Sequence, residues 1–126
     1  MSRRRMGGYS SPMIAVIFEL EPAEGRFPDY KRLAEELAPE LRKIDGFISV
    51  ERFESISRPG HFVSLSFWRD EEAVRQWRNL EGHRAAQTQG RGGIFRSYRL
   101  RVAQVLRDYT KDERREVPPD SSRVHG

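Results

Sequence analysis

The sequence predicts an α+β domain in which helices cover one face of a four-stranded antiparallel sheet. Three observations support this prediction. Four segments alternate their side chains with the two-residue period of a strand. Two segments between these strands repeat apolar residues every three or four positions, which is the period of a helix with one buried face. The length of 126 residues is enough for one domain with its own hydrophobic core.

The first predicted strand covers residues 13–21 and is apolar on both sides. Its two rows of apolar side chains are Ile14, Val16, Phe18 and Leu20 on one side, and Ala15 and Ile17 on the other. A strand with this pattern is typically covered on both faces.

The first predicted helix carries its apolar stripe on Tyr30, Leu33, Leu37, Leu41 and Ile44. Gly46 ends this helix, because glycine readily adopts the left-handed conformation that follows a last helical turn. Pro39 lies inside the stripe and removes one backbone hydrogen bond. We therefore expect a kink at this position or a split of the helix into two pieces.

A hairpin follows. Residues 47–55 and 61–68 alternate as strands do, and the short Pro59-Gly60 connection joins them as an antiparallel pair. The next segment, from Asp70 onward, reads as a second helix, since aspartate is a good N-cap residue. The buried face of this helix is predicted to carry Ala73, Val74, Trp77 and Leu80.

Gly82 is expected to interrupt the second helix, and a long last strand is expected over residues 97–109. The order strand, helix, strand, strand, helix, strand is that of a ferredoxin-like βαββαβ fold, whose two helices pack on one face of the sheet. The other face is also apolar, at Ala15, Ile17, Ala103 and Val105. A second copy of the chain is the simplest cover for this face, so we expect a homodimer.

Composition and charge exclude several kinds of protein. The chain has no cysteine, which excludes disulfides and thiolate metal sites and is compatible with the cytoplasm. Of the net charge of +4, Arg3, Arg4 and Arg5 supply three units, so residues 11–110 are nearly neutral and offer no basic groove to nucleic acid. No segment is long and apolar enough for a membrane span or a secretory signal.

These features predict a cytoplasmic domain at residues 12–110 between a disordered arm, residues 1–11, and a flexible tail, residues 111–126. The GRGG segment at residues 90–93 lacks the lysine and the spacing of a phosphate-binding loop. No pair of histidines and a carboxylate has metal-ligand spacing. We therefore expect neither a metal nor a cofactor.

Three segments together resemble the antibiotic biosynthesis monooxygenase family of dimeric α+β barrels. They are GFISVERFES, SFWRDEEAVRQWRNLEGHRAAQTQGR and SYRLRVAQVLRDY, at residues 46–55, 66–91 and 97–109. The resemblance implies a pocket in each protomer between the sheet and the helices. Family members of known activity oxidise phenolic aromatic compounds there with molecular oxygen, without metal or flavin. Related members degrade haem or act on quinols.

His83 is the candidate catalytic base, because oxygen reacts with a deprotonated phenol and an imidazole accepts a proton near neutral pH. A solvated or capping histidine beside Gly82 is an equally good interpretation. Gln87 and Arg91 follow His83 at intervals of four residues, so the three side chains form one row if the helix persists. Such a row could hold an anionic oxygen, although an arginine at this place more often forms a salt bridge.

Four aromatic residues are candidates for substrate binding: Phe18, Trp68, Trp77 and Tyr98. Their rings could stack on a planar substrate, and core packing is the alternative role for each of them. Trp77 is preferred over Trp68. Haem degraders of this group carry an asparagine on the first strand and an iron-binding histidine where Gln87 stands here, so haem degradation is a disfavoured alternative.

The predicted function is therefore a cofactor-independent monooxygenase that acts on a small phenolic or quinol-like aromatic substrate. Two other classes stay open. A non-catalytic homodimer could bind a small hydrophobic molecule in the same pocket. An RNA-recognition module shares the βαββαβ order, but GHFVSLSF at residues 60–67 lacks the full aromatic spacing of such modules.

Overall fold

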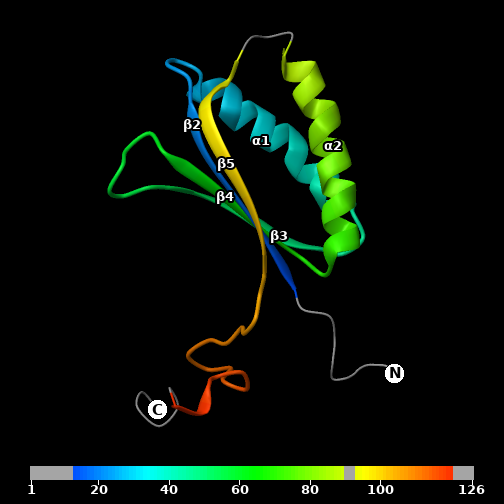
Figure 1. The fold of residues 1–126 in the computed structure, drawn as a ribbon. Coiled ribbons are helices and arrows are strands. Elements are labelled where there is room, and N and C mark those ends of the chain that lie inside the picture. The colour runs from blue at the N-terminus through cyan, green and yellow to red at the C-terminus, as the bar shows by residue number, and fades with distance from the viewer. Residues whose placement is uncertain (1–12, 90–92, 121–126) are drawn as a thin grey trace.

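The computed structural model describes residues 13–89 and 93–120, with the backbone alone described for residues 81–89. Its elements follow the predicted order (Figure 1): β2 (Ile14–Pro22), α1 (Phe27–Arg42), β3 (Phe47–Glu54), β4 (Phe62–Trp68), α2 (Glu71–Gln89) and β5 (Phe95–Gln104). The strands form one antiparallel sheet in the order β3-β4-β2-β5, and both helices lie on the same face. The predicted ferredoxin-like α+β fold is confirmed.

Strand pairing decides which side chains face the helices. Val16 of β2 pairs with Ser66 of β4 and with Val102 of β5. Directly paired residues of antiparallel strands point to the same face of a sheet. The row of β2 that contains Val16 packs against the helices.

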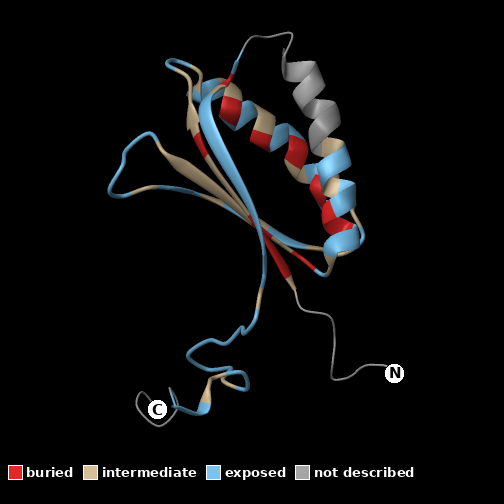
Figure 2. Ribbon diagram, viewed as in Figure 1, coloured by how far each residue is buried: buried red, intermediate tan, exposed pale blue. Residues whose placement is uncertain are grey.

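The space between sheet and helices holds two hydrophobic clusters. The first is built around Trp68 and Val16, which are the largest fully buried side chains, with Leu41 of α1 and Val74 of α2. The second lies toward the other end of β2, where Leu20 packs with Tyr30 of α1 and with Ile94. Figure 2 shows buried residues in red on α1, on β2 and in the first turns of α2.

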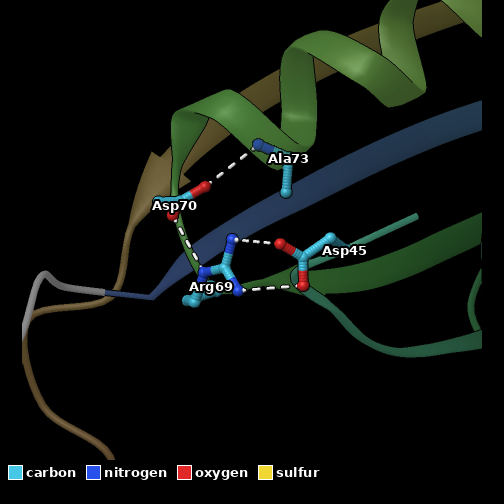
Figure 3. A network of polar contacts seen from close by, with 4 residues as sticks. All are labelled: Asp45, Arg69, Asp70 and Ala73. Atoms are coloured by element: carbon cyan, nitrogen blue, oxygen red, sulfur yellow. Dashed lines mark hydrogen bonds and ion pairs between the residues drawn. The ribbon is translucent and has the colours of Figure 1, made fainter.

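A polar network fixes the start of α2 (Figure 3). The N–H of Ala73 donates to Oδ1 of Asp70 at 3.0 Å, which confirms the predicted N-cap. The Arg69 guanidinium donates to both carboxylate oxygens of Asp45 at 3.2 Å and to Asp70 at 3.0 Å. The network thus joins the turn after α1 to the first turn of α2.

Three expectations about element ends are corrected. α1 runs through Pro39 without a split, because Leu37 and Leu41 are buried on either side of the proline and their packing holds the helix together. α2 continues through Gly82, where a glycine costs a helix only about 1 kcal/mol. β5 ends at Gln104 and not at residue 109, because its partner strand begins at Ile14 and offers no further ladder.

Beyond β5, residues 105–120 leave the sheet and run away from the helices (Figure 1). A local turn shapes this segment, in which the N–H of Thr110 donates to the carbonyl of Glu113 at 2.7 Å. Neither helix of the described chain is long and apolar enough to cross a membrane.

Candidate functional site

The helix-covered face of the sheet is accessible at its centre. Phe18 is only half-buried, although Val16 and Leu20 on the same face of β2 are buried. The residues paired with Phe18 are Ser64 of β4, which is also half-buried, and Leu100 of β5, which is exposed. We call these residues, together with Arg52 of β3, which pairs with Ser64, the central row. The side chains of this row therefore keep part of their surface exposed.

Aromatic rings border the central row on the side of β5. The Phe18 ring lies 5.7 Å from the rings of Phe95 and Tyr98, measured between centroids. Tyr98 is 67% exposed, and Figure 2 shows exposed residues along nearly the whole of β5. Two predicted substrate-binding residues, Phe18 and Tyr98, therefore lie together at an accessible place.

The two tryptophans lie together in the other cluster. Trp68 is 0% exposed, and its indole N–H donates to Oγ of Ser66 at 2.9 Å. Trp77 of α2 is half-buried, with its ring centroid 6.4 Å from that of Trp68. Trp68 has no surface to offer a ligand in this conformation, so the structure favours its core role. Trp77 has such a surface.

The predicted base and its row fall where side chains are not described. His83 and Gln87 belong to the C-terminal part of α2, which lies on the same face of the sheet as Phe18 (Figure 1). Arg91 lies outside the described residues. The roles given to these three side chains stay predictions.

A shallow cleft opens between the first turns of α2 and β5. It is lined by Glu71, Glu72, Val74, Arg75, Arg78 and Val102. Arg75 donates to Glu72, and this hydrogen bond lowers the pKa of the Glu72 carboxyl. The cleft is polar along α2, and Val102, which is exposed on β5, joins it to the apolar side chains beside the central row.

Two residues at the β3 end of the central row, Arg52 and Tyr30, were not predicted as site residues from the sequence. Arg52 is half-buried, and its guanidinium lies beside the hydroxyl of Tyr30. Burial raises the pKa of Tyr30, and the nearby Arg52 charge opposes this shift only in part. The sequence does show Arg52 as a charged residue within a regular strand pattern. Its neighbours follow only from the register in which β3 pairs with β4, which the sequence does not give.

Metal ligands are not grouped in the described part of the chain, where no cluster of three or more His, Asp or Glu side chains could hold an ion. Among the described residues, the candidate site therefore consists of the aromatic rings, Arg52 and the backbone of the helix that carries His83.

Known proteins resemble the chain over most of this domain. The family model for antibiotic biosynthesis monooxygenases matches residues 13–89. The chain belongs to this family. It is 47% identical over 105 residues to the jasmonate monooxygenase ABM of Pyricularia oryzae, covering 83% of the chain and 49% of that relative's length. The chain thus spans about half of this relative.

Two further proteins extend the comparison. The uncharacterized protein YqjZ of Bacillus subtilis is 32% identical over 96 residues, which cover 76% of this chain and 82% of YqjZ. SnoaB, a cofactor-independent oxygenase from Streptomyces nogalater, superimposes with a TM-score of 0.64 over 78% of this chain and 97% of its own. Its identity of 11% supports a common fold alone.

Proposed function

We propose that the protein is a monooxygenase that oxidises a small phenolic or quinol-like aromatic substrate with molecular oxygen and without a cofactor. The observation that supports this proposal best is the accessible aromatic floor at Phe18 in a chain of the antibiotic biosynthesis monooxygenase family. Phe18 and Tyr98 offer faces and edges on which a flat substrate can stack. The half-buried Trp77 supplies a third ring from α2.

The electron balance favours an electron-rich substrate. When a methylene group activated by a phenol becomes a carbonyl, one oxygen atom of O2 enters the product and the other leaves as water. The four electrons that O2 takes up all come from the substrate, so no external reductant is needed. The protein then has to bind the substrate, exclude water and remove a proton to form the anion that reacts with O2.

His83 is the proposed base for this proton. α2 carries it on the helix-covered side of the sheet, which is also the side of the central row. A neutral imidazole can accept a phenolic or carbon-bound proton at pH 7 and return it to solvent after the reaction. Gln87 and Arg91 are proposed to stabilise the developing oxyanion.

A homodimer is proposed as the working assembly. Ile17, Leu65 and Phe67 lie on the sheet face opposite the helices, where none of the described helices or strands covers them (Figure 1). All three are only half-buried. A second sheet packed against this face would bury them and leave the helix-side site of each protomer open to its substrate.

Oxygen uptake by the purified, metal-stripped protein tests the proposed reaction. The panel contains anthrones, quinols and catechols, together with jasmonate, which the name of the Pyricularia oryzae relative suggests. Jasmonate is assayed with and without an added electron donor, because it has no phenol to supply electrons. We expect turnover of a phenolic substrate without added cofactor, and a loss of about a hundredfold in His83→Ala.

His61→Ala is the matched control, since His61 lies at the start of β4, 3.5 Å from Glu21, and away from α2. It should keep the wild-type rate. Equal rates in wild type and His83→Ala would show that His83 is not the base. Binding of panel compounds without any oxygen uptake would instead indicate a non-catalytic protein that binds small molecules.

A further inference from the structure

Arg52 is a partly buried arginine of β3. It lies on the helix-covered face of β3, is half-buried, and forms no ion pair with any carboxylate of the described residues. Arginines elsewhere in the domain do pair with carboxylates, among them Arg69, Arg75 and Arg101. Taking a guanidinium partly out of water without a counter-charge lowers the stability of the fold. A bound ligand of opposite charge would offset this cost.

Tyr30 gives a second, independent observation at the same place. The residue is 7% exposed, and its hydroxyl oxygen is buried without a hydrogen-bond partner. Rings of Phe27, Phe62 and Phe95 surround the Tyr30 ring with centroids 5.9 to 6.3 Å away and fix its direction. The hydroxyl approaches the Arg52 guanidinium without forming a well-aligned hydrogen bond. The guanidinium is thus the polar neighbour of this hydroxyl, and neither group contacts a carboxylate of the described residues.

The central row provides room for the rest of a ligand. Ser64 separates Arg52 from Phe18 across the sheet, and neighbouring strands lie about 5 Å apart, which puts the two backbones about 10 Å from each other. The Ser64 side chain is short and half-buried, so part of the sheet surface between Arg52 and the Phe18 ring is exposed.

We propose that Arg52 binds the carboxylate of a small organic acid whose apolar body lies over Ser64 and against Phe18. Tyr30 is a positioning residue in this site, because its fixed hydroxyl lies next to the guanidinium and limits the directions the guanidinium can take. A planar guanidinium matches the two oxygens of a carboxylate. The inference rests on the proposed function and deepens it by giving the substrate an acidic group at the end remote from β5.

A carboxylate fits this site better than a phosphate. Among the residues whose side chains are described, Arg52 is the arginine at this place, and the walls are apolar rings and a serine. Phosphate sites usually combine several cations with backbone N–H groups of a glycine-rich loop or a helix N-terminus. The single charge and the apolar walls favour a monoanion with an attached hydrocarbon body.

Binding of a matched pair of probes tests the inference without requiring turnover. The probes are 1-naphthylacetate and its neutral amide, 1-naphthylacetamide, titrated by calorimetry. We expect the wild-type protein to bind the acid about tenfold more tightly than the amide, as a hydrogen-bonded ion pair with one guanidinium predicts. Arg52→Met should remove this preference and leave the affinity for the amide unchanged.

Two further variants separate ligand binding from general effects of charge and folding. Arg42→Met removes an exposed arginine of α1 and should keep the tenfold preference. Tyr30→Phe removes only the unpaired hydroxyl, so it should keep or raise the melting temperature while the preference for the acid falls about threefold. A merely structural tyrosine would leave that preference unchanged.

Equal affinity of the wild type for acid and amide, no binding of the acid, or an unchanged preference in Arg52→Met would each overturn the inference. Should Arg52→Met not fold, Arg52→Lys takes its place, and it should reduce the preference because a lysine lacks the two-point geometry. Preferential binding of the acid with no oxygen uptake on any substrate would refute the proposed oxidation alone. Oxidation of neutral phenols with no preference for acids would refute this inference alone.

Discussion

At the scale of single residues, Trp68 holds the floor of the first cluster in place. Its indole ring packs edge-on against Phe47, with 5.3 Å between centroids, and lies next to Trp77. Its N–H and the hydroxyl of Ser66 satisfy each other inside the core. A polar pair of this kind is stable only while both members are present, because the remaining group would be buried without a partner.

Each single replacement should leave the other polar group buried without a hydrogen-bond partner. The losses of stability in the two single variants should therefore add up to more than the loss in the double variant. We expect Trp68→Phe to lower the free energy of unfolding by about 3 kcal/mol, through lost volume and an unpaired Ser66 hydroxyl, and Ser66→Ala by about 1 kcal/mol. The double variant should lose less than the sum of the two. Urea denaturation measures all three. Strictly additive losses would mean that the hydrogen bond contributes nothing to stability.

A second prediction at the scale of single residues concerns how the contribution of Asp70 to the stability of the fold depends on pH. Burial alone would raise the pKa of its carboxyl, but the Ala73 N–H and the Arg69 guanidinium donate to it and hold the pKa below the usual value of 3.8. A carboxyl whose pKa is lower in the folded than in the unfolded chain stabilises the fold above the unfolded value. This contribution is lost as the pH falls through the folded value.

Asp70→Asn isolates that contribution, because asparagine also caps a helix but has no charge to lose. At pH 7 the wild type should be more stable than the variant by up to about 1 kcal/mol. The difference should be smaller at about pH 3, which lies below the unfolded pKa, and should vanish only below the still lower folded pKa. Urea denaturation at both pH values gives the comparison, and a difference that stays constant with pH would argue against a stabilising charge at Asp70.

At the scale of elements, Gly46 controls how α2 approaches the turn after α1. Its φ angle is +97°, and a Cβ atom placed there would lie 2.8 Å from Cβ of Ala73. Ala73 is fully buried and Arg69 closes the same contact from the other side. The position therefore excludes a side chain both by backbone conformation and by space.

Gly25 offers a matched control for this effect. Its φ angle is +75°, but nothing lies within 4 Å of a Cβ atom added there. We expect Gly25→Ala to cost about 1 kcal/mol for the backbone alone, and Gly46→Ala about 3 kcal/mol because a buried contact must also open. Thermal and urea denaturation report both values. Similar losses in the two variants would show that the packing of Gly46 against Ala73 is loose.

Periodicity predicted the elements well and their ends poorly. The alternation in residues 13–21 and the stripe from Tyr30 to Leu41 correspond to β2 and α1, because burial on one face imposes those periods. The split at Pro39, which was one of two outcomes expected there, and the break at Gly82 do not occur, since tertiary packing outweighs the local cost of one proline or glycine. The end of β5 depends on where β2 begins, which no local pattern contains.

For the candidate site, the sequence predicts which types of residue are present and on which face of the sheet they lie, but not which of them come into contact. Aromatic residues near the sheet were found from the sequence, and Phe18 and Tyr98 do lie together. Pattern alone could not separate the buried Trp68 from the half-buried Trp77, because both have apolar neighbours at the expected spacing. Arg52 and Tyr30 are 22 positions apart and meet only when α1 folds over β3, so their contact requires the tertiary structure.

At the scale of the whole molecule, the two helices cover one face of the sheet and leave the other face uncovered. Ala15 pairs with Phe67 and Ala103, and Ile17 pairs with Leu65, on the face that the helices leave uncovered. Glu19 and Arg101 form an ion pair at 2.6 Å on the same face and give it a polar border. An apolar centre with a polar border is typical of a surface that binds another protein surface.

The proposed dimer makes the last prediction. Leu65→Glu places a charge at the centre of the uncovered face, and burying that charge between two sheets without a partner would cost several kcal/mol. The wild type should sediment as a dimer and Leu65→Glu as a folded monomer in analytical ultracentrifugation. Ile56→Glu, at a fully exposed position of the β3–β4 turn, adds the same charge away from this face and should remain dimeric. A monomeric wild type, or a dimer that survives Leu65→Glu but not Ile56→Glu, would mean that the uncovered face is not the contact between copies.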